Sequence, residues 1–348
     1  GKSIRLPTLA IAEVETRLNE GLVGSRLPPG TAVVLDAVEF SVDSDFVPRF
    51  RLTDLRLIDI GGRSLLTLPE ALVSFDPRAL LSGRVQPKSV RLVGTRLMVR
   101  RDAEGGLDLS FAGLGEGAAG PQSLAEIDAK IEAVLATPFF ASLHEIEAEA
   151  LTLTLVDDRA KRTWQVGDGR LAITIDDRAI AAELGLSLLD GATLATAELR
   201  LTSARGAANG RLEAKVDTVA AGDLAALAPP LAWLAAVDAP ISGELAANIA
   251  NDGRVSGLTA NLSLAAGSLS PGEGARPVAF ESAGLALSYD PATARLTLSA
   301  LNVQSASLRL EAEGHADLLA GDGHPVAPDA MPAEVLAQID FRKVMIDP

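Results

Sequence analysis

Paired aspartates are the residues of this chain whose type and spacing come closest to a catalytic or metal-binding motif. Asp157-Asp158 and Asp176-Asp177 each stand directly before an arginine. Neighbouring carboxylates can carry out acid–base chemistry or bind calcium. Both pairs, however, follow strand-like segments at places where β-turns are expected, and aspartate is a preferred turn residue. No calcium-loop pattern surrounds them, so we interpret both pairs as turn formers.

Histidine and glycine give no stronger indication of catalysis. His144, His315 and His324 have no second histidine or carboxylate at a convincing metal-ligand spacing. The glycine pairs at 61–62 and 105–106 lack a phosphate-loop or dinucleotide context, and no Gly-x-Ser-x-Gly elbow occurs. We therefore predict a non-enzymatic protein without a metal or another cofactor.

The most basic local cluster consists of Arg96, Arg100 and Arg101. Such a cluster is suited to a lipid phosphate or another anionic headgroup. Such a cluster is more often a solvated strand face, and this second interpretation is the one we favour.

Composition limits the class of protein further. Of 348 residues, 48% are hydrophobic and only 3% are aromatic, so the core must be built mainly from aliphatic side chains. The net charge of −15 argues against a nucleic-acid partner, which requires a basic surface. The absence of cysteine excludes disulfides, thiolate zinc and iron–sulfur clusters.

The sequence contains no transmembrane helix. The longest apolar run, residues 224–237, is interrupted by two prolines and is shorter than the roughly 20 residues of a span. The chain opens at Gly1-Lys2 rather than at methionine. We therefore expect a piece of a longer protein, from which an upstream membrane anchor has been removed.

Alternation of apolar and polar residues is the dominant pattern. Side chains on a strand point to opposite faces in turn, so each alternating segment presents one aliphatic and one polar face. This pattern is typical of an antiparallel sheet with one face in water. The segments are 38–42, 50–52, 55–57, 90–92, 97–99, 151–155, 171–175, 199–201, 212–216, 245–249, 258–264, 285–289, 296–298, 308–310 and 339–341.

Helices are expected to be few. Helical spacing predicts one over residues 9–22, and a capping-box pattern predicts another over 123–135. A third is expected to begin near Asp223 and to break at Pro229. Short helical turns are expected at Asp76-Pro77 and after Pro332.

Three segments change the phase of their alternation and so predict bulges, which bend a sheet. They are residues 89–99, 146–155 and 301–310. The glycine-rich stretch 113–122 is typical of a linker. We therefore predict an N-terminal helix-plus-β module over 1–112, this linker, and a β-rich, groove-like module with two short helices over 123–348.

Several of these segments resemble a known family. They are Leu-Thr-Asp-Leu-Arg-Leu at 52–57, the runs 68–77 and 79–85, and Val-Arg-Leu-Val-Gly-Thr-Arg-Leu-Met-Val at 90–99 with 106–109. Over about residues 31–111 they resemble the amino-terminal module of AsmA-like proteins, in particular the YhdP-like branch.

The resemblance implies a bacterial envelope protein that is anchored in the inner membrane by one amino-terminal helix and extends into the periplasm. It also implies a bridge-type lipid carrier, in which a curled β-sheet forms an apolar groove for phospholipid acyl chains between the inner and outer membranes. Phospholipid is the partner that this resemblance implies. The present chain is long enough for only part of such a groove.

Elementary physics leaves two outcomes open. A sheet with one aliphatic face must bury it, either in a closed core or around a ligand. The expected fold is mainly β: a long curled antiparallel sheet, groove-like or open and barrel-like, with a few short helices. The alternative function is a structural or assembly module of the envelope that acts through protein partners. The candidate groove residues are Leu151, Leu153, Leu155, Leu171, Ile173, Ile175, Leu199, Leu201, Leu245, Ile249, Leu285, Leu287, Leu296, Leu298, Leu308 and Leu310.

Overall fold

Strands dominate the computed structural model, which is 67% strand and 10% helix. The predicted fold class, a mainly β protein with a curled sheet and few short helices, is confirmed. The structure describes the residue ranges 3–22, 32–42, 47–58, 60–62, 64–101, 107–111, 136–158, 161–190, 193–207, 209–227, 229–251, 255–270, 272, 276–326 and 332–346.

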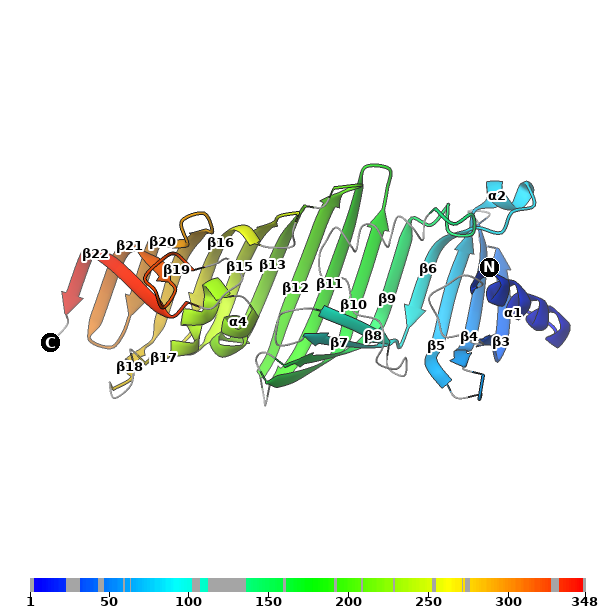
Figure 1. Ribbon diagram of the computed structural model, residues 1–348. Helices are drawn as coiled ribbons and strands as arrows, with labels where there is room; N and C mark the ends of the chain where they lie inside the picture. The colour runs from blue at the N-terminus through cyan, green and yellow to red at the C-terminus, as the bar shows by residue number, and fades with distance from the viewer. Residues whose placement is uncertain are drawn as a thin grey trace. The chain divides into compact units, whose positions relative to one another are not determined.

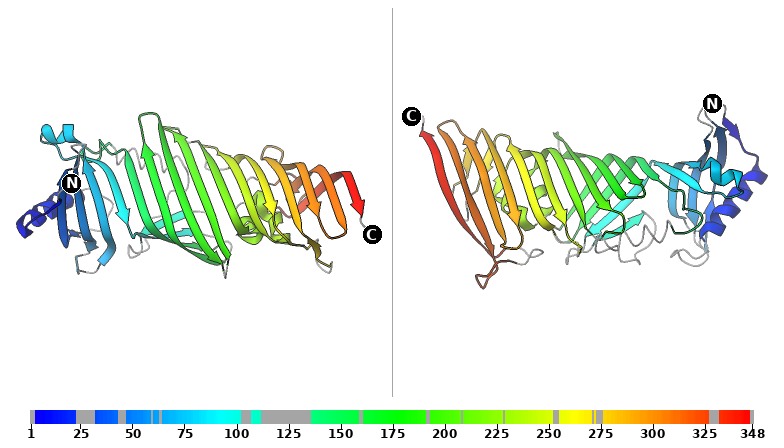
Figure 2. Two further views of the ribbon diagram at one scale, coloured as in Figure 1. Left: turned by 180° about the vertical axis from the view of Figure 1, so that it is seen from behind. Right: turned by 90° about the horizontal axis from the view of Figure 1, so that it is seen from above.

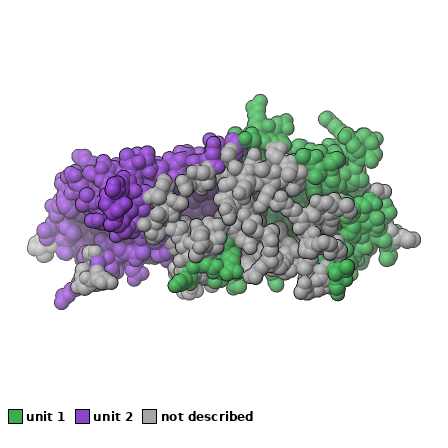
Figure 3. Space-filling model, viewed as in Figure 1, with its two compact units in different colours: residues 1–186, 204–206 green, residues 187–203, 207–348 purple. Residues whose placement is uncertain are grey.

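The chain packs as two compact units (Figure 3). Unit 1 comprises Gly1–Leu186 with Ala204–Gly206, and unit 2 comprises Ser187–Ser203 with Ala207–Pro348. The predicted linker at 113–122 lies outside the described residues, so the predicted domain division stays a prediction.

Unit 1 begins with a helix and continues as a sheet. Its long strands pair antiparallel in chain order from β3 to β6, as the alternation predicts. Its elements are β1 (Ser3–Arg5), α1 (Thr8–Leu22), β2 (Ala32–Val34), β3 (Ala37–Val42), β4 (Pro48–Ile58), β5 (Ser64–Phe75), α2 (Pro77–Leu81), β6 (Pro87–Val93), β7 (Arg96–Arg101), β8 (Leu107–Phe111), β9 (Glu145–Asp157), β10 (Arg162–Ile175) and most of β11 (Ala179–Asp190).

The sheet of unit 1 is mixed, whereas the sequence predicted an antiparallel one. β9 runs parallel to β6 along its first half and parallel to β7 along its second half. Parallel neighbours need a crossover of a dozen or more residues. The interval between Phe111 and Glu145 is long enough to supply one.

A bulge in β9 accompanies the break between β6 and β7. Ala150 has a φ of 49°, and the register with β10 shifts on both sides of Gly169. The bulge predicted within residues 146–155 is therefore confirmed. Opposite it, Gly94 has a φ of 74° and donates its N–H to Glu149 O at 3.0 Å, so both strand lines bend at the same level.

α1 covers one face of the sheet in unit 1. Its Ile11, Val14 and Leu18 pack against a core that contains Val38 and Leu52. Amphipathic spacing predicted this helix, and its observed start at Thr8 differs from the prediction by one residue. Burial of this apolar stripe is what stabilises a helix of such length.

Unit 2 is an antiparallel meander (Figures 1 and 2). Its long strands pair in the succession β12, β13, β15, β16, β19, β20, β21 and β22, while β14, β17 and β18 form a separate small sheet. The elements are β12 (Thr193–Ala204), β13 (Gly210–Ala220), α4 (Ala221–Leu227), the 3-10 helix η1 (Pro229–Ala236), β14 (Val237–Asp238), β15 (Pro240–Ile249), β16 (Val255–Leu264), β17 (Gly267–Leu269), β18 (Val278–Phe280), β19 (Ser282–Asp290), β20 (Arg295–Gln304), β21 (Leu308–Leu319) and β22 (Glu334–Ile346).

The other helix predictions are confirmed in part. α2 begins directly after Asp76, as predicted. The helix expected from Asp223 begins two residues earlier, at Ala221, and a 3-10 helix continues after Pro229. The turn expected after Pro332 is wrong, because the alternating segment from Glu334 pairs with β21 instead. The helix predicted over 123–135 lies outside the described residues. Within the described part of the chain, no helix has the length and apolarity needed to cross a membrane.

Candidate functional site

Unit 2 carries continuous rows of aliphatic side chains on one face of its sheet. Strand register aligns residues that share a face, so each row crosses eight neighbouring strands. We call the three rows together the aliphatic face; the only polar atom among their side chains is the hydroxyl of Tyr289. The first row is Leu199, Ala214, Leu245, Ala260, Leu287, Leu298, Gly314 and Ile339; the second is Leu201, Leu212, Ala247, Leu258, Tyr289, Leu296, Ala316 and Ala337; the third is Ala197, Val216, Gly243, Leu262, Leu285, Leu301, Ala312 and Phe341.

The opposite face of the same sheet is polar. A representative row, offset by one residue from the first aliphatic row, consists of Arg200, Glu213, Ala246, Thr259, Ser288, Thr297, His315 and Gln338. Alternation along each strand therefore produces two chemically distinct faces, as the sequence predicted.

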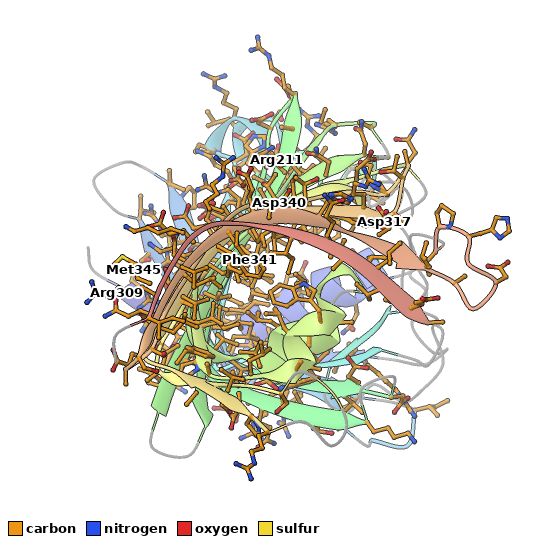
Figure 4. The ribbon with its side chains drawn as sticks, turned by 90° about the vertical axis from the view of Figure 1, so that its left-hand side faces the viewer. Arg211, Arg309, Asp317, Asp340, Phe341 and Met345 are labelled. Atoms are coloured by element: carbon orange, nitrogen blue, oxygen red, sulfur yellow. The ribbon has the colours of Figure 1, made fainter. Side chains whose placement is uncertain are left out.

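The aliphatic face lies on the inner side of a bend. Figure 4 shows β22 curved into an arc, with Phe341 on the inner side and Asp340 on the outer side. α4 and η1 lie on the inner side as well. Because of this curvature, the strand ends of unit 2 bend toward the side on which α4 and η1 lie.

Part of the aliphatic face is covered by the chain itself. Leu224 of α4 and Leu231 and Leu234 of η1 are buried in the same core as Leu285 and Leu287. Leu296 belongs to this core too. Three of the predicted groove residues thus belong to the buried core that α4 and η1 help to form.

Burial varies over the rest of the aliphatic face: Leu258 and Leu262 are buried as well, Ile339 and Phe341 are exposed, and other members are half-buried. The half-buried side chains keep part of their surface in contact with water, although the face contains almost no polar group. The half-buried predicted groove residues within the three rows are Leu199, Leu201, Leu245 and Leu298; Ile249, Leu308 and Leu310 are also half-buried but lie outside these rows. Leu245, Ile249 and Leu298 pack against the edge of the buried core.

The predicted groove residues of unit 1 divide in the same way. Leu151 is 0% exposed, Leu153 8% and Ile175 4%, so these three belong to a closed core. Leu153 stands in register with Val166 of β10 and with Leu97 of β7. The half-buried members are Leu155, Leu171 and Ile173.

The turn prediction is confirmed for Asp158, Asp176 and Asp177 but is wrong for Asp157, which is the last residue of β9 and only 2% exposed. Asp176 lies between β10 and β11, where its Oδ1 accepts the N–H groups of Arg178 and Ala179, both at 2.7 Å. These bonds, the one from Arg178 first, lower the pKa of Asp176. Its role is to close the hairpin, since a carboxylate that accepts main-chain N–H groups stabilises this turn.

The other residues considered for chemistry are dispersed. Among the described residues, no group of three or more histidine, aspartate or glutamate side chains is placed to hold a metal ion. Gly62 lies in the turn between β4 and β5, and residues 105–106 fall outside the described ranges. Arg100 pairs with Asp158, with 2.8 Å between Nε and Oδ2, across exposed surface. This pairing supports the interpretation of the basic cluster as a solvated strand face.

Sequence reasoning missed a polar network in unit 1. Ser142 Oγ lies 3.2 Å from Asp76 Oδ2 and 2.9 Å from Gln86 Oε1, and Gln86 Nε2 donates to Pro138 O at 2.6 Å. The network ties the segment around α2 to the segment that leads into β9. Each of these bonds joins residues more than 50 positions apart in the chain, and only the aspartate before Pro77 was recognisable from the local sequence.

Comparison with protein-family models, with curated proteins and with solved structures finds no match to this chain. The aliphatic face of unit 2 is therefore the observation from which a function must be argued.

Proposed function

We propose that this chain binds phospholipid acyl chains along the half-buried part of the aliphatic face. The supporting observation is the continuity of that face: three aliphatic rows cross eight strands, and the single polar group in them is the buried Tyr289. Large apolar patches on folded proteins are typical of binding surfaces for apolar partners.

The energetics favour an acyl chain as ligand. Removal of one CH₂ group from water contributes about 0.8 kcal/mol, so a two-chain lipid needs no specific polar contact to bind. A uniform aliphatic surface also offers no single site at which a chain would be held. Movement along the surface is then the mechanism by which such a protein would conduct lipid.

The resemblance to AsmA-like proteins supplies the setting of this proposal. In that setting the chain is a segment of an envelope protein that lies in the periplasm, is anchored to the inner membrane, and carries phospholipid toward the outer membrane. The curled sheet of unit 2 is consistent with such a carrier. A carrier of this kind acts by binding alone, without catalysis.

A second candidate function is a structural or assembly module that acts through protein partners. The observation that favours it is the self-covered part of the aliphatic face, where Leu287 and Leu296 are already buried under the chain's own side chains. A protein whose sheet is closed over its whole length would retain no lipid.

Native mass spectrometry of the purified chain, together with lipid extraction, tests the proposal. Stoichiometric phospholipid that survives gentle purification is the expected result. A mass equal to that of the chain alone, even after incubation with phospholipid vesicles, would favour the structural module.

A pair of variants locates the binding surface. Leu298→Asp places a charge on the half-buried part of the aliphatic face, whereas Thr297→Asp places one on the exposed polar face of the same strand. Because Leu298 also packs against the buried core, circular dichroism must show that both variants are folded before their lipid content is compared. We expect Leu298→Asp to lose most of its bound lipid and Thr297→Asp to retain it. Equal retention by two folded variants would remove this face from the lipid site.

A further inference from the structure

The connection between β5 and β6 in unit 1 holds aliphatic side chains out in water. It contains α2 and the residues after it, and it lies beyond the ends of these strands (Figure 1). Leu81, the last residue of α2, is 90% exposed, and Val85 is 47% exposed. A single exposed leucine is ordinary on a protein surface, so its meaning depends on what surrounds it.

Main-chain hydrogen bonds fix this connection in its exposed form. After α2, the N–H of Gly83 donates to Leu80 O at 2.9 Å. The N–H of Arg84 donates to Ala79 O, also at 2.9 Å, and the φ of Gly83 is 75°. These bonds form the Schellman motif that ends a helix, so the main chain itself keeps Leu81 exposed.

An aromatic turn from a distant part of the sequence lies against this connection. The polar network described above joins it to the turn over residues 136–142, through the 2.6 Å bond from Gln86 Nε2 to Pro138 O. The turn contains no charged residue. Its Phe139 and Phe140 are half-buried and pack edge to face, with 4.8 Å between ring centroids. The turn thus places two aromatic residues close to the exposed aliphatic ones.

The charge of the connection is opposite to that of the whole chain. Residues 76–88 contain one acid, Asp76, and three basic residues, Arg78, Arg84 and Lys88, whereas the chain carries a net charge of −15. All three basic residues are exposed. Asp76 Oδ1, by contrast, accepts the N–H of Arg78 as the N-cap of α2. Exposed cations beside exposed apolar residues are typical of proteins that bind anionic membrane surfaces.

These residues together are called the docking surface: Arg78, Leu81, Arg84, Val85, Lys88 and the turn over residues 136–142. We propose that the docking surface binds the surface of a bilayer that contains anionic phospholipid. Leu81 and Val85 enter the boundary between headgroups and acyl chains, and the cations meet lipid phosphates. Each cation near an anionic surface and each CH₂ group removed from water adds to the affinity.

The acidic remainder of the chain does not prevent this attachment. At roughly 0.1 M salt, charges on a protein surface are screened beyond about 10 Å, so distant carboxylates repel the bilayer only weakly. The inference goes beyond acyl-chain binding, because it uses residues of unit 1 alone and a bilayer rather than a single lipid. Either proposal can therefore fail while the other holds.

Sedimentation of the full chain with phospholipid vesicles tests the attachment. We expect the chain to sediment with vesicles that contain phosphatidylglycerol and less with vesicles of pure phosphatidylcholine. At about 1 M salt, where the screening length falls to about 3 Å, binding to the anionic vesicles should weaken. No sedimentation with the anionic vesicles, or equal binding to both compositions, overturns the proposal. Phospholipid that copurifies with a chain unable to bind vesicles would overturn it too, and would leave acyl-chain binding intact.

Two variants with matched controls locate the attachment. Leu81→Asp removes the exposed aliphatic side chain and Arg84→Glu reverses one charge, so each should weaken vesicle binding by about tenfold. Ile60→Asp, at an 88% exposed isoleucine in the turn between β4 and β5, and Arg56→Glu on β4 should bind as the wild type does. These controls lie toward the opposite ends of the strands. Undiminished binding by folded Leu81→Asp or Arg84→Glu, or an equal loss in the controls, overturns the proposal.

The absence of cysteine permits a second test, because one introduced thiol carries a fluorescent label at a single position. With a polarity-sensitive label on Leu81→Cys, we expect the emission to move to shorter wavelengths when anionic vesicles are added. The label on Ile60→Cys should show no such shift. Leu298→Asp, which removes acyl-chain binding in unit 2, should leave the shift at residue 81 unchanged. A shift at residue 60 as large as that at residue 81, or loss of the shift in folded Leu298→Asp, assigns the attachment to another surface and overturns the proposal.

Discussion

The side-chain amide of Asn19 makes both hydrogen bonds with Val33 that a neighbouring strand would otherwise make. Val33 N–H donates to Asn19 Oδ1 at 2.7 Å, and Asn19 Nδ2 donates to Val33 O at 3.2 Å. Asparagine is suited to this task because its amide offers a donor and an acceptor in one plane, as a peptide group does. The position of α1 beside β2 thus protects this edge of unit 1.

Replacement of Asn19 by leucine should remove both bonds while it preserves the size of the side chain. We expect the free energy of unfolding of unit 1 to fall by about 1–3 kcal/mol, because two half-buried main-chain groups lose their partners. Urea unfolding measures this loss, and hydrogen exchange should show faster exchange of the Val33 amide.

Thr16→Ala is the matched control for this variant. Thr16 is exposed on the same helix, and its hydroxyl bonds only within α1, to Ala12 O at 2.8 Å. It should change stability by no more than about 0.5 kcal/mol. Equal losses in the two variants would show that the amide of Asn19 has no special role at this edge.

Much of the fold follows from local pattern, because alternation specifies both a strand and the face that it buries. The segments around Leu262 and Leu287 alternate strictly, and each became a strand with the aliphatic residues on one face. Choice of partner is not encoded locally, and the parallel pairing of β9 was missed for that reason. Pro332 was a misleading signal, because the helix propensity of a few residues is weak beside a full ladder of bonds to β21.

The sequence predicts which side chains share the aliphatic face, but it does not predict which of them are exposed to solvent. Leu287 and Leu298 lie opposite each other in one row and have the same sequence pattern, yet the first is buried and the second is half-buried. Their difference depends on where α4 and η1 pack, which is a property of the tertiary structure.

The bulge at Ala150 was visible in the sequence as a change in the phase of the alternation. The predicted bulge over 301–310 proved to be mainly the β20–β21 hairpin.

Asp76 should make the stability of unit 1 sensitive to acid. Its Oδ1 accepts the N–H of Arg78 at 2.8 Å as the N-cap of α2, and this bond, followed by the bond from Ser142, lowers the pKa of Asp76 below the ordinary 3.8. A group whose pKa is lowered by folding contributes stability above its ordinary pKa and loses it as the pH falls through the folded value. Thermal unfolding at pH 7 and near pH 3 should therefore show a decrease on acidification.

The Asp76→Asn and Asp76→Ala variants separate the charge from the cap. Asparagine is as good an N-cap as aspartate, so Asp76→Asn should keep most of the stability at pH 7 and lose this part of the acid sensitivity. Asp76→Ala should cost about 1 kcal/mol at pH 7. An acid-induced decrease of the same size in Asp76→Asn and in the wild type would assign the effect to other carboxylates.

Gly314 should tolerate no larger residue, because β22 lies too close to it. A Cβ at this position would stand 2.2 Å from Gln338 O and 3.0 Å from the Cα of Ile339. Main-chain atoms of a paired strand cannot move away cheaply, so we expect Gly314→Ala to destabilise unit 2 by about 1–3 kcal/mol. Urea unfolding gives the measurement, followed by the fluorescence of Trp233 in a Trp164→Phe background, because Trp164 of unit 1 also emits.

Gly284→Ala provides the comparison, since the nearest atom to its added Cβ would be Leu262 O at 4.0 Å. Both glycines lie within strands, so the two substitutions gain the same conformational entropy and differ in the space available. Gly284→Ala should be neutral or slightly stabilising. A neutral Gly314→Ala would mean that β22 does not approach β21 this closely in solution.

Leu153→Asp should unfold unit 1 rather than act on lipid binding alone. Leu153 is 8% exposed and packs in register with Val166 and Leu97, so an aspartate there would bury an unpaired charge and remove aliphatic contacts. The expected loss exceeds about 3 kcal/mol, whereas Thr152→Asp at the exposed neighbouring position should stay within about 1 kcal/mol of the wild type. Circular dichroism and urea unfolding of both variants measure the difference. A folded Leu153→Asp of near-normal stability would instead mean that this side chain faces an open, wetted surface, and it would return Leu153 to the set of candidate lipid contacts.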